Sequence, residues 1–182
     1  MDNISVRSLT PTDPDIDKVK NLMYTLFPED EQSTIEELLQ INNSMECEFH
    51  AYYCSNEFLG FSFVIYKCGI VYLHYLAIDE AFQSMGYGTH ILKSIKQTHK
   101  DALVVLDIEP LDESAQNYNQ RIHRWHFYEK NGFHLTPYYL YHEGVEYQVV
   151  SSSGLLHTEN YRMLLEDIAP EYKQSTIYSK QT

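Results

Sequence analysis

Gly86 and Gly88 lie one residue apart in the chain, where an apolar run gives way to a helical pattern. Glycine has no Cβ, so the backbone N–H groups of such a turn can converge on an oxyanion. A helix that begins at the turn adds unpaired N–H groups and the positive end of its dipole. The segment can therefore bind a pyrophosphate without help from basic side chains.

Three phosphate-binding loop patterns place glycines at such a turn. The P-loop pattern GxxxxGK[ST] does not occur in the chain, and the dinucleotide pattern GxGxxG lacks its third glycine here. The third pattern, [QR]xxGx[GA], is met by QSMGYG, from Gln83 to Gly88. The alternative is that the glycines only form a tight strand-to-helix turn that binds no ligand.

Two segments extend this loop pattern into a family resemblance. LAIDEAFQSMGYGTHIL (residues 76–92) and FYEKNGFHL (residues 127–135) resemble the two signature segments of the GNAT superfamily of acyl-CoA-dependent N-acyltransferases. The expected order of elements from Ile4 to about Ser152 is also similar to that of the family. The resemblance does not cover the residues from Gly154 on.

The resemblance implies acetyl-CoA as cosubstrate, and from the residues themselves we expect no metal. The backbone of residues 76–78 would pair with the pantetheine arm like an added strand, and the amides of residues 83–89 would hold the pyrophosphate. Gln83 stands where the family often has arginine, so one positive charge is missing. The cofactor-binding residues expected are Leu76, Ala77, Ile78, Gln83, Ser84, Met85, Gly86, Tyr87, Gly88, Thr89 and Asn117.

Tyr128 is the candidate proton donor. In the family, the tyrosine of FYxxxGF often lies near the CoA sulfur, and FYEKNGF contains it. A phenol, with a pKa near 10, is protonated at neutral pH and can protonate the departing thiolate. The alternative is that Tyr128 only packs against pantetheine.

Two residues compete for the role of general base. Glu109 follows the buried run ALVVLDI, where partial desolvation can raise the pKa of a carboxylate. His74 lies on the strand before the glycine loop, in a segment similar to that of aralkylamine N-acetyltransferases, in which a histidine helps to carry the proton away. A hydrogen-bonded core histidine explains His74 as well, and ordered water needs neither residue.

The helix that carries Tyr128 also presents two arginines on the same stripe, Arg121 and Arg124. They either hold an anionic group of the acceptor or cofactor, pair with Asp107 and Glu109, or lie on a solvated face. The acceptor site is expected near FPEDEQ (around residues 29–32) and PYYLYHEG (residues 137–144). Carboxylates and tyrosines there favour a cationic or aromatic amine, although a solvated acidic turn explains the first segment equally well.

The periodicity of the chain predicts the elements that position these residues. We expect strands at 4–10, 47–54, 58–66, 70–78 and 102–110, a hairpin over 136–152, and helices at 11–27, 29–41, 86–99, 113–133 and 157–168. The last residues are expected to be loose. This order predicts an α/β (α+β type) fold, a mixed, twisted, mostly antiparallel sheet with helices on both faces. Residues 1–153 would form the acetyltransferase domain and 154–182 its helical extension.

The composition excludes some classes of binding partner for the chain. A formal net charge of −13 over 182 residues argues against a nucleic-acid or anionic-membrane partner. The apolar stretch 58–78 is as long as a membrane span, but Lys67 and Gly69 within it favour two strands and a turn. Three cysteines without a CxxC pair are typical of buried reduced thiols, so we expect a cytoplasmic protein. The histidines show no metal-ligand spacing, and a homodimer is a further expectation.

The predicted function is acetyl-CoA-dependent transfer of an acetyl group to the primary amine of a small molecule or peptide, by direct attack on the thioester. The alternative is a catalytically inactive acyl-CoA-binding or interaction module with the same fold.

Overall fold

The computed structural model describes residues 4–180, which divide into two compact units. Unit 1 comprises the described residues up to Ile65 and the segment Leu73–Ser94; unit 2 comprises Tyr66–Tyr72 and the described residues from Ile95 on. The boundary passes through two strands and one helix, which therefore contribute to both units. The predicted division into 1–153 and 154–182 follows the extent of the family resemblance and stays a prediction.

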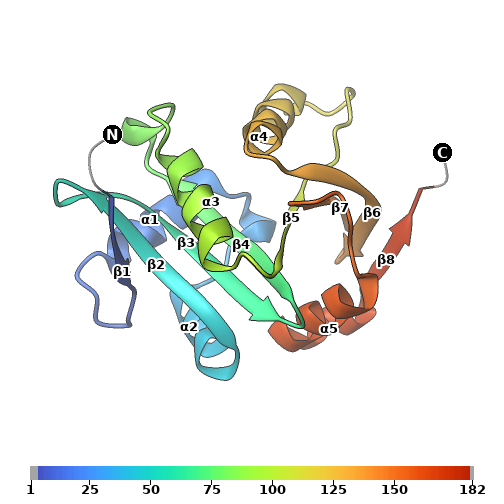
Figure 1. Ribbon diagram of the computed structural model, residues 1–182, viewed down its shortest axis with the longest axis horizontal. Coiled ribbons are helices and arrows are strands. Elements are labelled where there is room, and N and C mark those ends of the chain that lie inside the picture. The colour runs from blue at the N-terminus through green and yellow to red at the C-terminus, as the bar shows by residue number, and fades with distance from the viewer. Residues whose placement is uncertain (1–3, 181–182) are drawn as a thin grey trace. The chain divides into compact units, whose positions relative to one another are not determined.

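Unit 1 holds the N-terminal elements of the chain (Figure 1). They are β1 (Ile4–Ser8), α1 (Ile16–Leu26), α2 (Ile35–Ser44), β2 (Glu46–Cys54), most of β3 (Glu57–Lys67) and β4 (Ile70–Ile78), and the first turns of α3 (Tyr87–Thr98). The strands follow the order β1-β2-β3-β4, and β1 pairs antiparallel with β2. Short 3-10 turns occupy Glu29–Glu31 and Glu80–Phe82.

Side chains of α1, α2, β2 and β3 form the core of unit 1. Val19 and Leu38 are fully buried, and the rings of Phe49 and Phe63 meet edge to face with centroids 5.3 Å apart. α2 begins with a capping box, in which the Thr34 hydroxyl accepts from the Glu37 N–H and the Glu37 carboxylate accepts from the Thr34 N–H. Local capping and apolar periodicity therefore agree with the packing.

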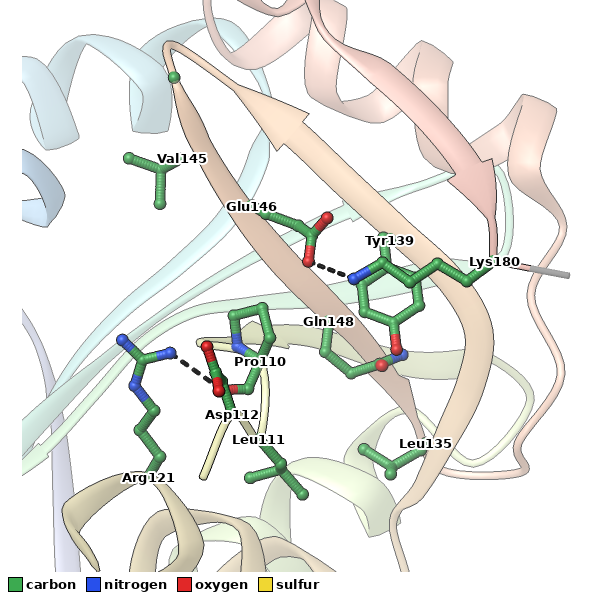
Figure 2. Close-up of a pocket in the computed structure, with 11 residues that line it drawn as sticks. Pro110, Leu111, Asp112, Arg121, Leu135, Tyr139, Val145, Glu146, Gln148 and Lys180 are labelled. Carbon is green, nitrogen blue, oxygen red and sulfur yellow. Dashed lines mark hydrogen bonds and ion pairs between the residues drawn. The ribbon is translucent and has the colours of Figure 1, made fainter. Parts of the chain in front are cut away.

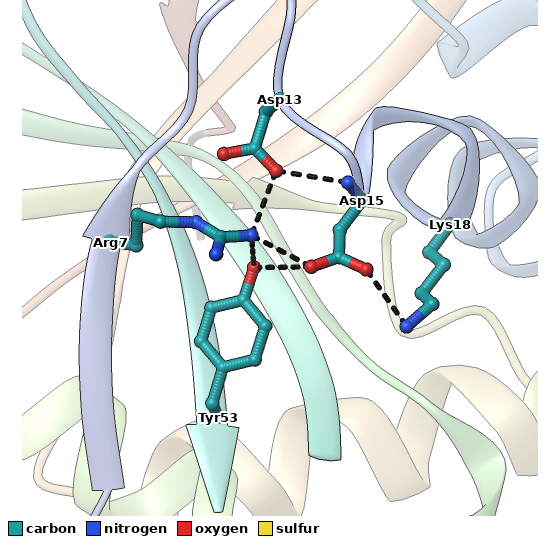
Figure 3. Close-up of polar contacts among 5 residues, drawn as sticks. All are labelled: Arg7, Asp13, Asp15, Lys18 and Tyr53. Carbon is teal, nitrogen blue, oxygen red and sulfur yellow. Dashed lines mark hydrogen bonds and ion pairs between the residues drawn. The ribbon is translucent and has the colours of Figure 1, made fainter. Parts of the chain in front are cut away.

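A polar network attaches the edge strand β1 to the start of α1 (Figure 3). The Arg7 guanidinium donates to Asp13 at 2.8 Å and to Asp15 at 2.7 Å, and it also contacts the Tyr53 hydroxyl. Tyr53 in turn donates to Asp15 at 2.9 Å. A bond from Lys18, followed by those from Tyr53 and Arg7, lowers the pKa of Asp15. The network holds residues 10–15 in turns, so α1 begins at Ile16 and not at the predicted residue 11.

Unit 2 contains the remaining elements. They are β5 (Leu103–Ile108), α4 (Tyr118–Lys130), β6 (His134–His142), β7 (Val145–Ser151), α5 (Thr158–Ile168), a 3-10 turn (Pro170–Gln174) and β8 (Thr176–Ser179). The strand order is β4-β5-β7-β6-β8. β4 and β5 are parallel, whereas β7 is antiparallel to β5 and β6, and β8 is antiparallel to β6. The predicted mixed, mostly antiparallel sheet is confirmed.

Two boundaries in unit 2 differ from the sequence prediction. α4 begins at Tyr118 and not at Glu113, because the Asp112 carboxylate accepts from both the N–H and the hydroxyl of Ser114 and holds the preceding residues in turns. α4 ends at Lys130 and not at the predicted residue 133, because Gly132, with a φ of +75°, stops the helix. The expectation that the last residues are loose is wrong for 170–179, where β8 lies beside β6 (Figure 1).

The cysteines are in three different environments. Cys54 is buried and Cys47 is half-buried, but Cys68 is exposed, because it occupies the β3–β4 turn with a φ of +51°. The expectation that all three thiols are buried is therefore wrong for Cys68. The stretch 58–78 forms β3, this turn and β4, and no helix in residues 4–180 is long and apolar enough to cross a membrane.

Candidate active site

The glycine loop of unit 1 has the backbone of an anion-binding turn. After β4, the Asp79 carboxylate caps a 3-10 turn by accepting from the Ala81 N–H at 3.0 Å. Ser84 and Gly86 then have positive φ values of 62° and 87°, and α3 begins at Tyr87. The first turn of α3 contains no acidic side chain. The N–H groups of this turn and of the helix start can therefore receive an anion.

Two side chains attach this loop to neighbouring strands of unit 1. The Gln83 amide donates to the Ile78 carbonyl at 2.9 Å, at the end of β4. The Tyr87 hydroxyl donates to the Cys54 sulfur on β2 at 3.5 Å, and its ring meets Phe82 edge to face. In this state the Gln83 side chain fixes the loop. Its predicted contact with pyrophosphate stays a prediction.

Gly60 on β3 is a residue that the sequence prediction missed. It has a φ of +152°, and a Cβ built on it would lie 2.0 Å from the Ala77 carbonyl oxygen on β4. The Leu59 carbonyl accepts from the Asp79 N–H at 2.8 Å, so the two strands stay paired around this close approach. An isolated glycine inside an apolar strand signals such an approach. Gly60 therefore shapes β4 where Leu76–Ile78 are predicted to bind pantetheine.

His74 lies on β4 two residues before that segment. Its ring packs against Phe63 and Tyr75, with centroids 6.2 and 4.4 Å away. The side chain keeps partial solvent contact, but burial of the ring lowers its pKa to about 4. The imidazole is therefore neutral at neutral pH and can accept a proton only as a weak base.

Tyr128 lies near the end of α4 in unit 2. Its ring meets Phe127 and Phe133 edge to face, with centroids 5.1 and 5.8 Å away. Burial raises the pKa of its hydroxyl to about 12, although the nearby Arg124 charge opposes this shift. Tyr128 is thus a protonated phenol at neutral pH, as a proton donor must be.

Glu109 lies directly after β5, and it has two partners on α4 and a third, Asn117, at the N-cap of this helix. The Arg121 guanidinium is 3.1 Å from one carboxylate oxygen and that of Arg124 is 3.3 Å from the other. The Asn117 amide donates to Glu109 at 2.9 Å and accepts from Arg121 at 2.7 Å. Of the three alternatives for the arginines, the pairing with Glu109 is the one observed. The cofactor role of Asn117 and the base role of Glu109 stay predictions.

Asp107 does not take part in that pairing. Its carboxylate accepts from the Tyr72 hydroxyl at 2.7 Å and from the Tyr161 hydroxyl at 2.6 Å. Burial raises its pKa to about 6, although both hydroxyls stabilise the ionised form. The cluster joins β4, β5 and α5 within unit 2.

A comparison of the sequence with protein-family models identifies the family of this chain. Residues 46–135 match the model of the acetyltransferase (GNAT) domain. The chain contains a GNAT acetyltransferase domain. The matched range includes the glycine loop, His74, Glu109 and Tyr128, and it begins with β2. In residues 4–180 of this GNAT protein, no group of three or more His, Cys, Asp or Glu side chains is placed to hold a metal.

Solved structures share the GNAT fold with this chain. A GNAT-family protein from Bacteroides thetaiotaomicron has a TM-score of 0.67 at 21% identity, over 87% of this chain and 92% of its own. An aminoglycoside 6'-N-acetyltransferase complexed with coenzyme A has 0.63 at 18% identity, over 84% and 98%. A GNAT acetyltransferase from Elizabethkingia anophelis with acetyl-CoA bound has 0.58 at 18% identity, over 83% and 98%. These likenesses show the fold alone. No curated protein matches the chain.

Proposed function

We propose that the chain is an acetyl-CoA-dependent N-acetyltransferase that acetylates a primary amine by direct attack on the thioester. The observation that carries the proposal is the loop Gln83–Thr89, which lies inside the matched GNAT domain and opens α3 with positive-φ residues. Two solved structures with this fold hold coenzyme A or acetyl-CoA. We assign the pyrophosphate to this loop and the pantetheine arm to the backbone of residues 76–78.

The reaction needs three proton and charge events. The acceptor must be an uncharged amine, since an ammonium has no lone pair. Its nitrogen bonds to the thioester carbonyl carbon, and the collapse of the tetrahedral oxyanion breaks the C–S bond. The nitrogen loses a proton to a base, and the CoA thiolate receives one. We assign the second transfer to Tyr128, because its raised pKa keeps the phenol protonated.

The candidates for the general base are Glu109, His74 and ordered water. Two arginines engage the carboxylate of Glu109, which would have to leave at least one of them to accept a proton. The low pKa of His74 keeps it unprotonated but makes it a weak base. Both residues are kept as candidates, with water acting alone as the third route.

The acceptor is proposed as the primary amine of a small molecule or peptide. Solved structures of this fold include an aminoglycoside N-acetyltransferase and a ribosomal-protein-S18-alanine N-acetyltransferase from Escherichia coli. The first is named for an aminoglycoside and the second for an alanine of a ribosomal protein, so the fold by itself does not select an acceptor. Cytoplasmic location, a homodimer and the absence of nucleic-acid and membrane partners stay predictions from the sequence.

A thermal-shift titration with acetyl-CoA tests the proposal, with NAD and ATP as controls. A ligand at about 100 times its Kd stabilises the folded chain by about 2.7 kcal/mol, or roughly 5–10 °C for a chain of this size. A shift with acetyl-CoA alone, followed by CoA release when amines are added, supports the transferase. A shift without CoA release from any amine supports the inactive binding module. No shift at millimolar acetyl-CoA contradicts both.

Gly86→Val tests whether the loop holds the cofactor. A valine side chain would crowd the turn, so the acetyl-CoA shift should disappear. Gly69→Val is the matched control, because Gly69 also has a positive φ, +77°, but open space around its Cβ position and no place in the loop. Retained acetyl-CoA binding in Gly86→Val would show that the loop does not hold the pyrophosphate.

A further inference from the structure

A cavity of about 580 Å³ lies within unit 2 and is not used in the assignments above (Figure 2). Its walls come from the loop after β5, from α4, from β6 and β7, and from Lys180 just after β8. The volume is that of a site for a small organic ligand. Polar and apolar side chains both line it, so the chemistry of the wall can define the class of ligand.

Arg121 forms a rigid cationic part of this wall. Its Nε donates to Asn117 at 2.7 Å and its Nη1 to the Pro110 carbonyl at 2.9 Å, and its Nη2 lies 3.1 Å from Glu109. Three partners thus fix the guanidinium, which retains further N–H groups. A guanidinium held in this way is suited to a carboxylate.

Glu146 and Lys180 form an ion pair at the other side of the cavity (Figure 2). The Lys180 ammonium donates to Glu146 at 2.5 Å and lies 4.1 Å from the centre of the Tyr139 ring. The Tyr178 hydroxyl also donates to Glu146. The bond from Lys180, followed by that from Tyr178, lowers the pKa of Glu146, so the carboxylate stays ionised at neutral pH.

The charges of the wall are balanced. Asp112 and Glu146 supply two carboxylates, and Arg121 and Lys180 supply two cations. The bonds from Ser114 lower the pKa of Asp112, so this carboxylate is also ionised. A ligand with several negative charges would be repelled by the two carboxylates, and one with several positive charges would be repelled by the two cations. A ligand with one charge of each sign finds a partner for both.

Three aliphatic side chains complete the lining, those of Leu111, Leu135 and Val145. We propose that this cavity binds a small zwitterion of the α-amino acid class, with its carboxylate at Arg121 and its ammonium at Glu146. The aliphatic wall would receive the side chain. Such a ligand also carries a primary amine, which becomes an acceptor for the transfer once its ammonium has lost a proton to the base; this last link alone rests on the proposed function.

Calorimetric titration without acetyl-CoA tests the binding, using ligands that share one hydrocarbon skeleton. L-leucine carries both charges, 3-methylbutylamine lacks the carboxylate, and 4-methylpentanoate lacks the ammonium. We expect saturable binding of L-leucine and at least about tenfold weaker binding of the other two, since each loses a charged hydrogen bond. Equal binding of the amine or the acid, or no binding of any aliphatic L-amino acid, would overturn the proposal.

Variants locate the ligand in the cavity. Arg121→Gln and Glu146→Gln should each weaken L-leucine binding by about tenfold or more. Arg162→Gln and Glu159→Gln on α5 remove the same charges away from the cavity and should leave binding unchanged. Because Arg121 also contacts Glu109, a second change is needed in case the first variant misfolds.

Lys180→Gln supplies that second change. Lys180 is half-exposed near the end of the described chain, and its loss leaves the wall with excess negative charge. The preference for L-leucine over 3-methylbutylamine should therefore fall; an unchanged preference would contradict the charge assignment. In a separate assay, L-leucine that binds but releases no CoA from acetyl-CoA, while another amine does, would refute only the acceptor link. Failure of acetyl-CoA to bind would refute the proposed function without affecting the titration.

Discussion

Replacement of Gly60 by alanine should destabilise the chain far more than replacement of an ordinary turn glycine. The new Cβ would lie 2.0 Å from the Ala77 oxygen, and 3.0 Å from the Ala77 carbonyl carbon and from the Ile78 Cα. All three are backbone atoms of β4, which cannot rotate away as the end of a flexible side chain can. The strand itself would have to move by about 1 Å or more to restore an ordinary contact.

The size of the effect follows from two sources. Overpacking of a buried site costs about 1–3 kcal/mol, and an L-residue at a φ of +152° adds about 1–3 kcal/mol of backbone strain. The free energy of unfolding should therefore fall by roughly 2–6 kcal/mol, which lowers Tm by roughly 4–24 °C for a chain of this length. Gly69 in the β3–β4 turn has a φ of +77°, and no atom lies within 4 Å of the Cβ that Gly69→Ala would add. Its cost is the backbone strain alone, about 1–2 kcal/mol.

Urea unfolding and thermal melting of the two variants beside the wild type make the comparison. Equal stabilities of Gly60→Ala and Gly69→Ala would refute the steric reasoning. A second readout concerns the cofactor: at a temperature where both variants are folded, acetyl-CoA should bind more weakly to Gly60→Ala than to Gly69→Ala, because only the first displaces residues 76–78. Equal cofactor binding would show that Gly60 serves stability only.

Three further predictions concern the chemistry. Tyr128→Phe should lower kcat by about 10²-fold or more without weakening acetyl-CoA binding, whereas Tyr118→Phe on the same helix should change neither; unchanged turnover would remove the proton-donor role. Burial raises the pKa of Asp107 from 3.8 to about 6, so stability from its proton is present below about pH 4 and lost as the pH rises through 6. Between about pH 4 and 6, the free energy of unfolding of Asp107→Asn relative to the wild type should therefore rise by up to about 3 kcal/mol, as measured by urea unfolding. A difference that does not change with pH would contradict the raised pKa. His74, with a pKa of about 4, is neutral from about pH 6 to 9. His74→Ala should therefore leave the shape of the pH profile of kcat/KM unchanged in this range. The variant that loses more kcat, His74→Ala or Glu109→Gln, identifies the more important of the two candidate bases.

The sequence by itself predicted the elements and the loop. Apolar periodicity located the helices and strands, because each buries one face against the rest of its unit. The QSMGYG segment predicted a tight glycine turn at the start of a helix, and the structure has such a turn at Ser84–Gly86 with α3 beginning at Tyr87. These features are local: glycine backbone freedom and the unpaired N–H groups of a helix start depend on neighbours in sequence alone.

Tertiary packing alone decided which polar groups pair. Asp107 and Glu109 lie two residues apart after the same apolar run, yet one binds two tyrosines and the other two arginines. The partners of Asp107 come from β4 and α5, far away in the sequence, so the residues around it in the chain could not predict its raised pKa. Desolvation depends on what packs over a group, and this is set by the whole unit.

The same reason explains β8, Gly60 and the cavity. The segment Thr176–Ser179 is short and weakly patterned, and it becomes a strand because β6 offers an edge to pair with. Gly60 could be marked as unusual from its place in an apolar strand, but its contact with Ala77 needs the pairing of β3 with β4. Arg121 and Lys180 line one cavity although 59 positions separate them, because only the folding of unit 2 brings α4 near the end of β8. Local chemistry thus determined the loop, and long-range packing determined the charges around it.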